Sequence, residues 1–165
     1  MASSSLDQQS KILTLKSSDG DLFEIESSIA VQSGTLKNMM EDNYYNLIPL
    51  PNVDTETLIK IIEYMKKHAV KTDSNEGEIK EFDKEFVKKS LHELFGVLLA
   101  ANYLNVSGLM DLMSQSIADR IKNKSVKAVR TIFGITNDYT PEEEEKVRQQ
   151  HHWAHEGKEI DESID

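Results

Sequence analysis

The N-terminal part of the chain alternates apolar and polar side chains in the way that half-buried β-strands do. Residues 12–15 (ILTL) are apolar or β-branched, and residues 22–26 (LFEIE) alternate apolar and acidic positions. Between them, Asp19-Gly20 tolerates the positive φ angles of a tight turn. The pattern predicts an antiparallel hairpin with one face in water. Residues 47–51 (LIPLP) predict a third short strand, which its prolines confine to a sheet edge or to the end of a ladder.

Between and after these strands the apolar spacing is helical. Two short helical turns are expected near Ser27 and Ser33, with inward-facing side chains at Ile29, Val31, Leu36, Met39 and Met40. Asp54 lies at the N-cap position of a longer helix that ends near His68, and its apolar residues recur at i, i+3, i+4 and i+7: Leu58, Ile61, Ile62 and Met65. Residues 70–81 (VKTDSNEGEIKE) have no periodic apolar pattern and predict a surface loop.

The second half of the chain predicts helices only. Ser90 and Glu93 form a capping-box pattern before a helix that is apolar on most sides, so this helix is expected at the centre of the core. Ser107 is expected to cap the next helix, and Ser125 opens a shorter one that stops at Gly134. Strands with helices, followed by helices alone, define an α+β class.

The last predicted helix has a clear start but little apolar surface. Thr140 is expected to cap it, with Pro141 at its first position and four glutamates at its positive end. Its only sizeable apolar residues are Val147, Trp153 and Ala154. Because it cannot bury a continuous stripe, we expect this helix to become ordered only when a partner docks.

Charge argues against nucleic acid as a partner. The net charge of the chain is −10, which repels a phosphate backbone. One basic cluster stands out, and it lacks the interleaved aromatic residues of a nucleic-acid site: Arg120, Lys122, Lys124, Lys127 and Arg130. We interpret the cluster as a solvated face opposite a buried one.

The chain contains no cysteine, which excludes disulfides, thiolate zinc sites and a cysteine nucleophile. No apolar run approaches the about 18 residues of a membrane span, so no membrane partner is predicted. Residues 1–10 lack the apolar region of a signal peptide and are expected to form a disordered lead. The predicted location is the nucleus and cytoplasm.

No catalytic constellation emerges from the sequence. The phosphate-binding glycine motifs and the G-x-S-x-G elbow are absent, and the glutamates at 142–145 are explained by the helix dipole. His151, His152 and His155 could be metal ligands, but three solvated histidines on an acidic helix are favoured. The prediction is therefore of no enzyme, no cofactor, no metal and no small-molecule substrate.

Trp153, the one tryptophan, lies near the end of the polar last helix. Tryptophan offers roughly 150–250 Å² of surface for burial and is enriched among interface anchors. Two readings remain open: an anchor for a partner, slightly favoured, or a side chain that folds back on the core.

Five blocks of sequence resemble the Skp adaptor family of SCF (Skp–cullin–F-box) ubiquitin ligases, in register over residues 11–156. The most specific is residues 94–105 (LFGVLLAANYLN). The others are residues 13–20 (LTLKSSDG), 49–53 (PLPNV), 137–145 (NDYTPEEEE) and 153–154 (WA).

The resemblance implies a BTB/POZ-type fold over residues 11–122, with the loop at 70–81, an F-box-binding helical extension at 123–156 and an acidic tail at 157–165. It implies a non-catalytic adaptor that bridges a cullin and F-box proteins. The implied cullin face contains Asn102, Tyr103, Pro51 and Asn52. The implied F-box groove is lined by Leu109, Leu112, Ile117, Ile121, Val129, Phe133 and Trp153.

The chain departs from the family pattern at several positions, namely Phe82 for tryptophan, Ser90-Leu91 for Asp-Gln, Lys127-Ala128 for an acidic pair and His155 for phenylalanine. These changes indicate a divergent member with a narrowed set of partners. They also keep open a rival interpretation, a BTB-type structural protein that self-associates and has lost cullin binding.

Overall fold

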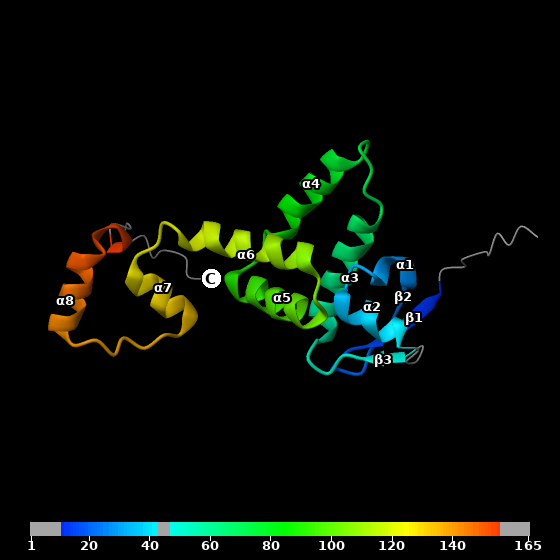
Figure 1. The fold of residues 1–165 in the computed structure, drawn as a ribbon, viewed down its shortest axis with the longest axis horizontal. Coiled ribbons are helices and arrows are strands. Elements are labelled where there is room, and N and C mark those ends of the chain that lie inside the picture. The colour runs from blue at the N-terminus through cyan, green and yellow to red at the C-terminus, as the bar shows by residue number, and fades with distance from the viewer. Residues whose placement is uncertain (1–10, 43–46, 156–165) are drawn as a thin grey trace, which may run out of the picture.

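The computed structural model describes residues 11–42 and 47–155 of the chain. In this part, the three predicted strands form one mixed sheet in the order β2-β1-β3 (Figure 1). Strand β1 (Ile12–Lys16) pairs antiparallel with β2 (Leu22–Glu26), and Leu15 lies opposite Phe23. Gly20 in the connecting turn has a φ of 92°. The predicted hairpin is confirmed.

Strand β3 (Leu47–Pro49) runs parallel to β1 at the sheet edge, as its prolines required. The helices are α1 (Ser27–Ala30), α2 (Gly34–Glu41), α3 (Thr55–Ala69), α4 (Glu76–Phe86), α5 (Leu91–Leu104), α6 (Ser107–Ile121), α7 (Val126–Phe133) and α8 (Pro141–Gln150), followed by the 3-10 turn η1 (His152–His155). The predicted α+β class is confirmed.

Most of the predicted helix caps are confirmed. The side chains of Asp54, Ser125 and Thr140 each accept a hydrogen bond from a backbone N–H of the first turn, and Ser90 forms a complete capping box with Glu93. The cap predicted at Ser107 is wrong. The N-cap of α6 is Val106, which has no side-chain acceptor, and Ser107 is the first helical residue.

The surface loop predicted at residues 70–81 is also wrong in its second half, because α4 begins at Glu76. Ile79 and Phe86 are buried and Phe82 packs on the core. These residues stand at i, i+3 and i+7, but only the first lies within 70–81, so the stripe is invisible in that window. Val31, expected to face inward, is exposed.

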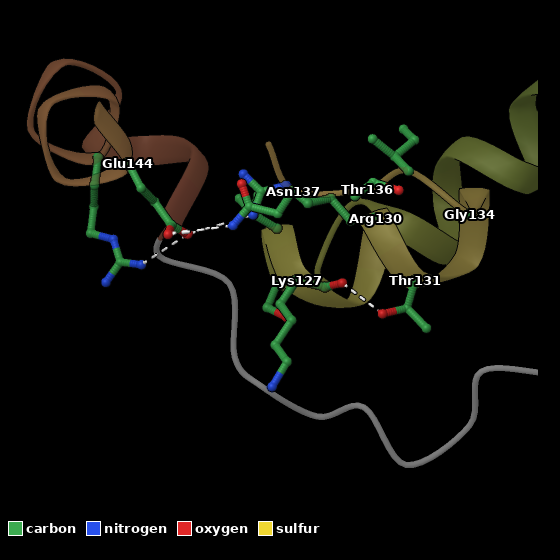
Figure 2. Close-up of a pocket in the computed structure, with 11 residues that line it drawn as sticks. Lys127, Arg130, Thr131, Gly134, Thr136, Asn137 and Glu144 are labelled. Carbon is green, nitrogen blue, oxygen red and sulfur yellow. Dashed lines mark hydrogen bonds and ion pairs between the residues drawn. The ribbon is translucent and has the colours of Figure 1, made fainter. Parts of the chain in front are cut away.

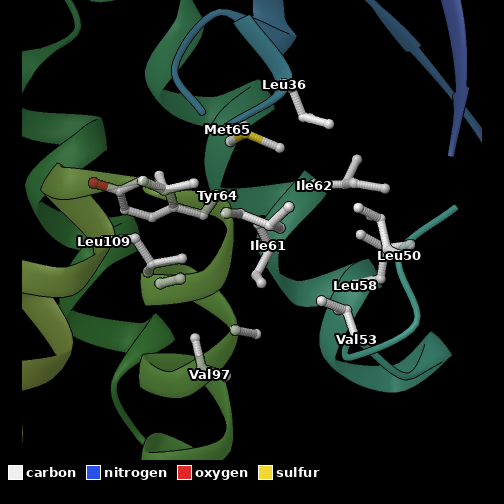
Figure 3. Packing of buried hydrophobic residues seen from close by; sticks show 14 of the residues in the cluster. Leu36, Leu50, Val53, Leu58, Ile61, Ile62, Tyr64, Met65, Val97 and Leu109 are labelled. Atoms are coloured by element: carbon white, nitrogen blue, oxygen red, sulfur yellow. The ribbon is translucent and has the colours of Figure 1, made fainter. Parts of the chain in front are cut away.

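The core lies between the sheet and helices α3, α5 and α6 (Figure 3). Its least exposed large side chains come from these four elements, from α2 and from the loop after β3: Leu13, Leu15, Ile25, Leu36, Leu50, Leu58, Ile61, Met65, Leu94, Leu104, Leu109 and Met113. Helix α5 buries Leu94, Val97 and Ala101, which confirms its central place, yet Leu99 on the same helix is 70% exposed. This exposed leucine belongs to the first of two candidate binding surfaces.

The last helices leave the body of the molecule. Helix α6 packs along α5 and then carries the chain to α7 and α8, which lie at the far end from the sheet (Figure 1). We call the sheet with α1–α6 the POZ body, after the fold that the sequence resemblance implies for residues 11–122, and residues 126–155 the C-terminal arm. The arm touches the body through Phe133, whose ring meets Phe95 of α5 edge to face at 5.1 Å between centroids.

Candidate partner-binding surfaces

The first surface is a pocket of about 370 Å³ on the POZ body, between α5 and the loop that leads into α3. We call it the body pocket. Asn52, Val53, Asp54 and Thr57 line one side, and Gly96, Leu99, Ala100 and Tyr103 line the other. Two residues of the predicted cullin face, Asn52 and Tyr103, are therefore brought together from distant parts of the chain. Pro51 and Asn102, the other two, are exposed beside them in sequence.

Hydrogen bonds to backbone carbonyl oxygens fix both walls of the body pocket. The carbonyl oxygen of Val53 accepts a hydrogen bond from the N–H of Ser18 at 2.8 Å, and the N–H of Leu50 donates to Lys16 at 2.8 Å. These bonds hold the loop against the hairpin. On the other wall, the hydroxyl of Thr35 donates to the carbonyl oxygen of Tyr103 at 3.0 Å.

Sequence reasoning missed Leu99, the largest apolar side chain that the body pocket shows to solvent. The signal was present, because α5 is apolar on more sides than one core can cover. A leucine that is 70% exposed on a rigid central helix is the kind of side chain that a partner buries. The body pocket can therefore offer a protein partner one apolar contact framed by polar groups.

The second surface is a cavity of about 510 Å³ in the C-terminal arm, between α7 and α8. We call it the arm groove. It is lined by residues 125–127, Arg130, Thr131, residues 134–137, Glu144 and Arg148. Figure 2 shows Glu144 of α8 reaching toward Arg130 of α7 and Asn137 of the connecting loop.

Glu144 is the polar centre of the arm groove. Its carboxylate lies 3.5 Å from Arg130 and 3.8 Å from Arg148, and it accepts a hydrogen bond from the side-chain amide of Asn137 at 3.4 Å. Helix α8 itself has no buried residue. Long, partly exposed polar contacts are worth little each, so the spacing between α7 and α8 is weakly fixed.

Several large apolar side chains of the arm are exposed to solvent. Phe133 is 42% exposed, Ile135 58%, Tyr139 45% and Trp153 76%. The Trp153 ring contacts His151 edge to face at 6.4 Å between centroids. The interpretation that Trp153 folds back on the core is therefore wrong.

The seven residues predicted for the F-box groove do not line one open surface. Leu109 and Ile117 are buried in the core of the POZ body, so their side chains support α6 and are closed to a partner. Leu112, Ile121 and Val129 are half-buried, while Phe133 and Trp153 are exposed. The apolar stripe of a helix indicates which of its faces is buried. The sequence does not reveal which part of that face is covered by the chain's own core and which part stays open to a partner.

Two ionisable groups of the POZ body have pKa values that their surroundings shift. The N–H of Thr57 lowers the pKa of the Asp54 carboxyl by hydrogen bonding to it, which is the effect of helix capping. Burial raises the pKa of the Tyr64 hydroxyl to about 12. Across residues 11–42 and 47–155, no group of three or more His, Asp or Glu side chains could hold a metal ion.

In the same described residues, no helix is long and apolar enough to cross a membrane.

The chain matches two family models, the Skp1 family tetramerisation domain over residues 11–70 and the Skp1 family dimerisation domain over residues 107–154. The first covers the whole sheet with α1, α2 and α3, and the second covers α6 and nearly all of the C-terminal arm.

Curated plant proteins are similar to the chain along most of its length. SKP1-like protein 1A of Arabidopsis thaliana is 46% identical over 157 residues, covering 88% of this chain and 98% of the relative. SKP1-like protein 4 of the same plant is 47% identical over 158 residues, covering 88% and 97%. SKP1-like protein 1 of Oryza sativa subsp. japonica is 44% identical over 168 residues, covering 90% and 97%.

These matches confirm the predicted POZ fold with its C-terminal helices, and they agree with the prediction that the chain is not an enzyme. The chain belongs to the Skp1 family, a family of non-catalytic adaptors.

Proposed function

We propose that the chain is an adaptor that bridges a cullin scaffold and F-box substrate receptors in an SCF ubiquitin ligase. The observation that carries the proposal is the separation of two exposed surfaces, one on the POZ body and one on the C-terminal arm. The body pocket presents Leu99 with Asn52 and Tyr103, and the C-terminal arm presents Phe133 and Trp153. Family membership supports the identity of the two partners.

The cullin would bind the body pocket. Leu99 supplies an exposed apolar contact, Asn52 and Tyr103 line the pocket with it, and the exposed Pro51 and Asn102 adjoin them in sequence. Both walls are held by hydrogen bonds to backbone carbonyl oxygens, so the surface needs little rearrangement to bind. This is the arrangement of a small anchor within a hydrated rim.

The F-box protein would bind the C-terminal arm together with the neighbouring part of α6. Leu112, Ile121, Val129, Phe133 and Trp153 are the predicted groove residues that remain accessible or half-accessible, and Ile135 and Tyr139 extend them. Leu109 and Ile117 would act from the core beneath. Helices of a partner laid against this surface would bury apolar area that the chain leaves exposed.

Adaptor action requires no bond-making by this chain. Holding a substrate receptor and a ligase scaffold on one frame raises the effective concentration of substrate near the ligase. The positive charges of Lys127 and Arg130, on the rim of the arm groove, would favour F-box proteins with acidic residues at this contact and disfavour those with basic residues. This preference would narrow the set of F-box proteins that bind. The proposed site of action is the nucleus and cytoplasm.

The test is reconstitution from purified components. Mixing the full chain with a cullin N-terminal fragment and an F-box protein should yield a ternary complex whose mass, by light scattering, equals one copy of each. Failure of the chain to join the two partners would sink the proposal.

A homo-oligomeric structural role is the alternative. Ile12 and Leu22 are exposed on the hairpin, at 54% and 61%, next to the free edge of β2. In the same experiment, a stable oligomer of the chain alone with no affinity for cullin would favour this role.

A further inference from the structure

A basic notch lies where α4 ends, α5 begins and α6 ends. It is open to solvent, has a volume of about 650 Å³ and shares no lining residue with the body pocket or the arm groove. Four of its lining residues are cationic and one is a carboxylate, in the set Lys88, Lys89, Ser90, Leu91, Glu93, Arg120 and Lys124. The chain has a net charge of −10, so the notch is a positively charged site on a negatively charged protein.

The one carboxylate of the basic notch is already engaged. Glu93 accepts a hydrogen bond from the backbone N–H of Ser90 at 3.1 Å and another from the ammonium of Lys60, outside the notch, at 3.3 Å. Lys88 is paired with Glu85 at 2.5 Å. Because the capping box occupies the start of α5, the helix end itself has little left to offer a ligand.

The other three cations lack an acidic partner. Among the described residues, no ion pair reaches Lys89, Arg120 or Lys124. Two of them are nevertheless held in place. The guanidinium of Arg120 donates to the carbonyl oxygen of Val87 at 2.7 Å, and the ammonium of Lys89 lies 3.8 Å from the centroid of the Phe86 ring. Held cations lose little freedom when they bind an anion.

The Lys89 charge is poorly compensated within the chain. Burial lowers the pKa of this ammonium, and the nearby Lys60 lowers it further, against smaller opposing effects of Glu63 and Glu93. An anion in the notch would relieve this cost.

We propose that the basic notch binds a phosphate-type oxyanion through Arg120, Lys89 and Lys124. A guanidinium has five N–H donors, and one donor nitrogen of Arg120 is tethered to Val87, so others remain for a ligand. Guanidinium and ammonium groups together match the charge and the several acceptor oxygens of a phosphate group. The strongly negative chain repels an extended polyanion, so the ligand is a compact phosphate compound or a single phosphorylated side chain.

This inference is independent of the proposed adaptor function. The sequence pattern alone placed Arg120 and Lys124 in a solvated basic face. The structure adds Lys88 and Lys89 from another helix end and separates all four from Lys127 and Arg130, which line the arm groove.

The test uses the full chain labelled for amide NMR and titrated with inorganic pyrophosphate at low ionic strength. Shifts are expected at residues 86–93 and 118–125, and affinity should fall as salt is added. The variant K124Q should weaken binding by about tenfold. K124Q removes no described contact, so it retains the fold. R120Q should weaken binding further, although it also loses the tether to Val87.

The matched control is K37Q, which removes the same charge from an exposed position on α2 outside the notch. It should leave pyrophosphate affinity within about twofold, as expected for a distant screened charge. Shifts scattered over all lysines, or equal losses in K37Q and K124Q, would mean general charge attraction and overturn the proposal. So would the absence of any binding.

Two peptides identify the source of the oxyanion. A peptide with one phosphoserine that binds more tightly than pyrophosphate, and loses affinity in K124Q, indicates a phosphorylated polypeptide. The reverse order indicates a free phosphate compound. If the same peptide without its phosphate binds equally well, the notch recognises other groups of the peptide and the assignment to phosphate is wrong.

Discussion

Phe95 of α5 and Phe133 of α7 meet edge to face, with ring centroids 5.1 Å apart and ring planes at 69°. The contact joins the C-terminal arm to the helix at the centre of the POZ body. Phe95 is half-buried against the core, while Phe133 is 42% exposed. One ring therefore anchors the arm, and the other divides its surface between the body and solvent.

The first prediction concerns this pair. Replacing either ring with alanine should lower the free energy of unfolding, and the double variant should show a coupling of about 0.5–1.5 kcal/mol in a mutant cycle. F133A alone should cost less than the about 3–5 kcal/mol of a fully buried phenylalanine. Urea denaturation of the four proteins measures all of these values. Strictly additive effects would show that the rings do not hold the arm.

The second prediction uses Trp153 as a probe. It is the one tryptophan of the chain and is 76% exposed. Its fluorescence should be that of a solvated indole in the free protein and should shift to the blue when an F-box protein binds. W153A should leave the free energy of unfolding within about 0.5 kcal/mol and weaken F-box binding by about tenfold or more.

Blue-shifted emission from the free protein would contradict the exposure of Trp153. A matched control is Y139A, on the same surface but with a smaller, 45% exposed ring, which should weaken F-box binding less than W153A does.

The third prediction tests the body pocket. Leu99 is 70% exposed, so L99E should fold normally and yet lose cullin capture, because a charge replaces the apolar contact of the pocket. L22E is the control, since Leu22 is 61% exposed on β2 and lies outside the pocket. Capture assays with a cullin N-terminal fragment compare the two. Equal capture by L99E and the unmodified chain would move the cullin surface elsewhere.

Local rules predicted much of the fold. The hairpin, the edge strand with its prolines and the caps at Asp54, Ser90, Ser125 and Thr140 all follow from neighbours within a few residues. The failures lie where the deciding partner is distant. Helix α4 forms because Ile79, Phe82 and Phe86 pack against the side of the core. Residues 70–81 contain only the first of these three side chains, so the sequence of that segment alone could not predict the helix.

The surfaces were harder to predict for the same reason. Asn52 and Tyr103 meet only because the loop before α3 folds against α5, and the resemblance supplied the pairing that spacing could not. Leu109 and Ile117 share a stripe with accessible residues, so periodicity alone could not separate core from groove. Exposure of Leu99 depends on which sides of α5 remain uncovered, and that is a property of the whole fold.

The last prediction concerns pH and the Asp54 cap at the start of α3. Its carboxylate accepts a hydrogen bond from the N–H of Thr57 at 2.7 Å, which lowers the pKa of Asp54 below its ordinary value of 3.8. A lowered folded-state pKa means that the ionised cap contributes stability above the ordinary value. That contribution is lost as the pH falls through 3.8 toward the folded-state pKa.

Two variants separate the charge of this cap from its hydrogen bond. D54A should lower the free energy of unfolding by about 1 kcal/mol at neutral pH. D54N keeps an acceptor oxygen but loses the negative charge, and with it the interactions with the helix dipole and with Lys60, about 0.3–1 kcal/mol for the dipole. Because protonation removes the same charge from the unmodified chain, its advantage over D54N should shrink as the solution is acidified. Urea denaturation at neutral and acid pH measures the difference, and an advantage that stays constant with pH would show that the Asp54 charge contributes nothing.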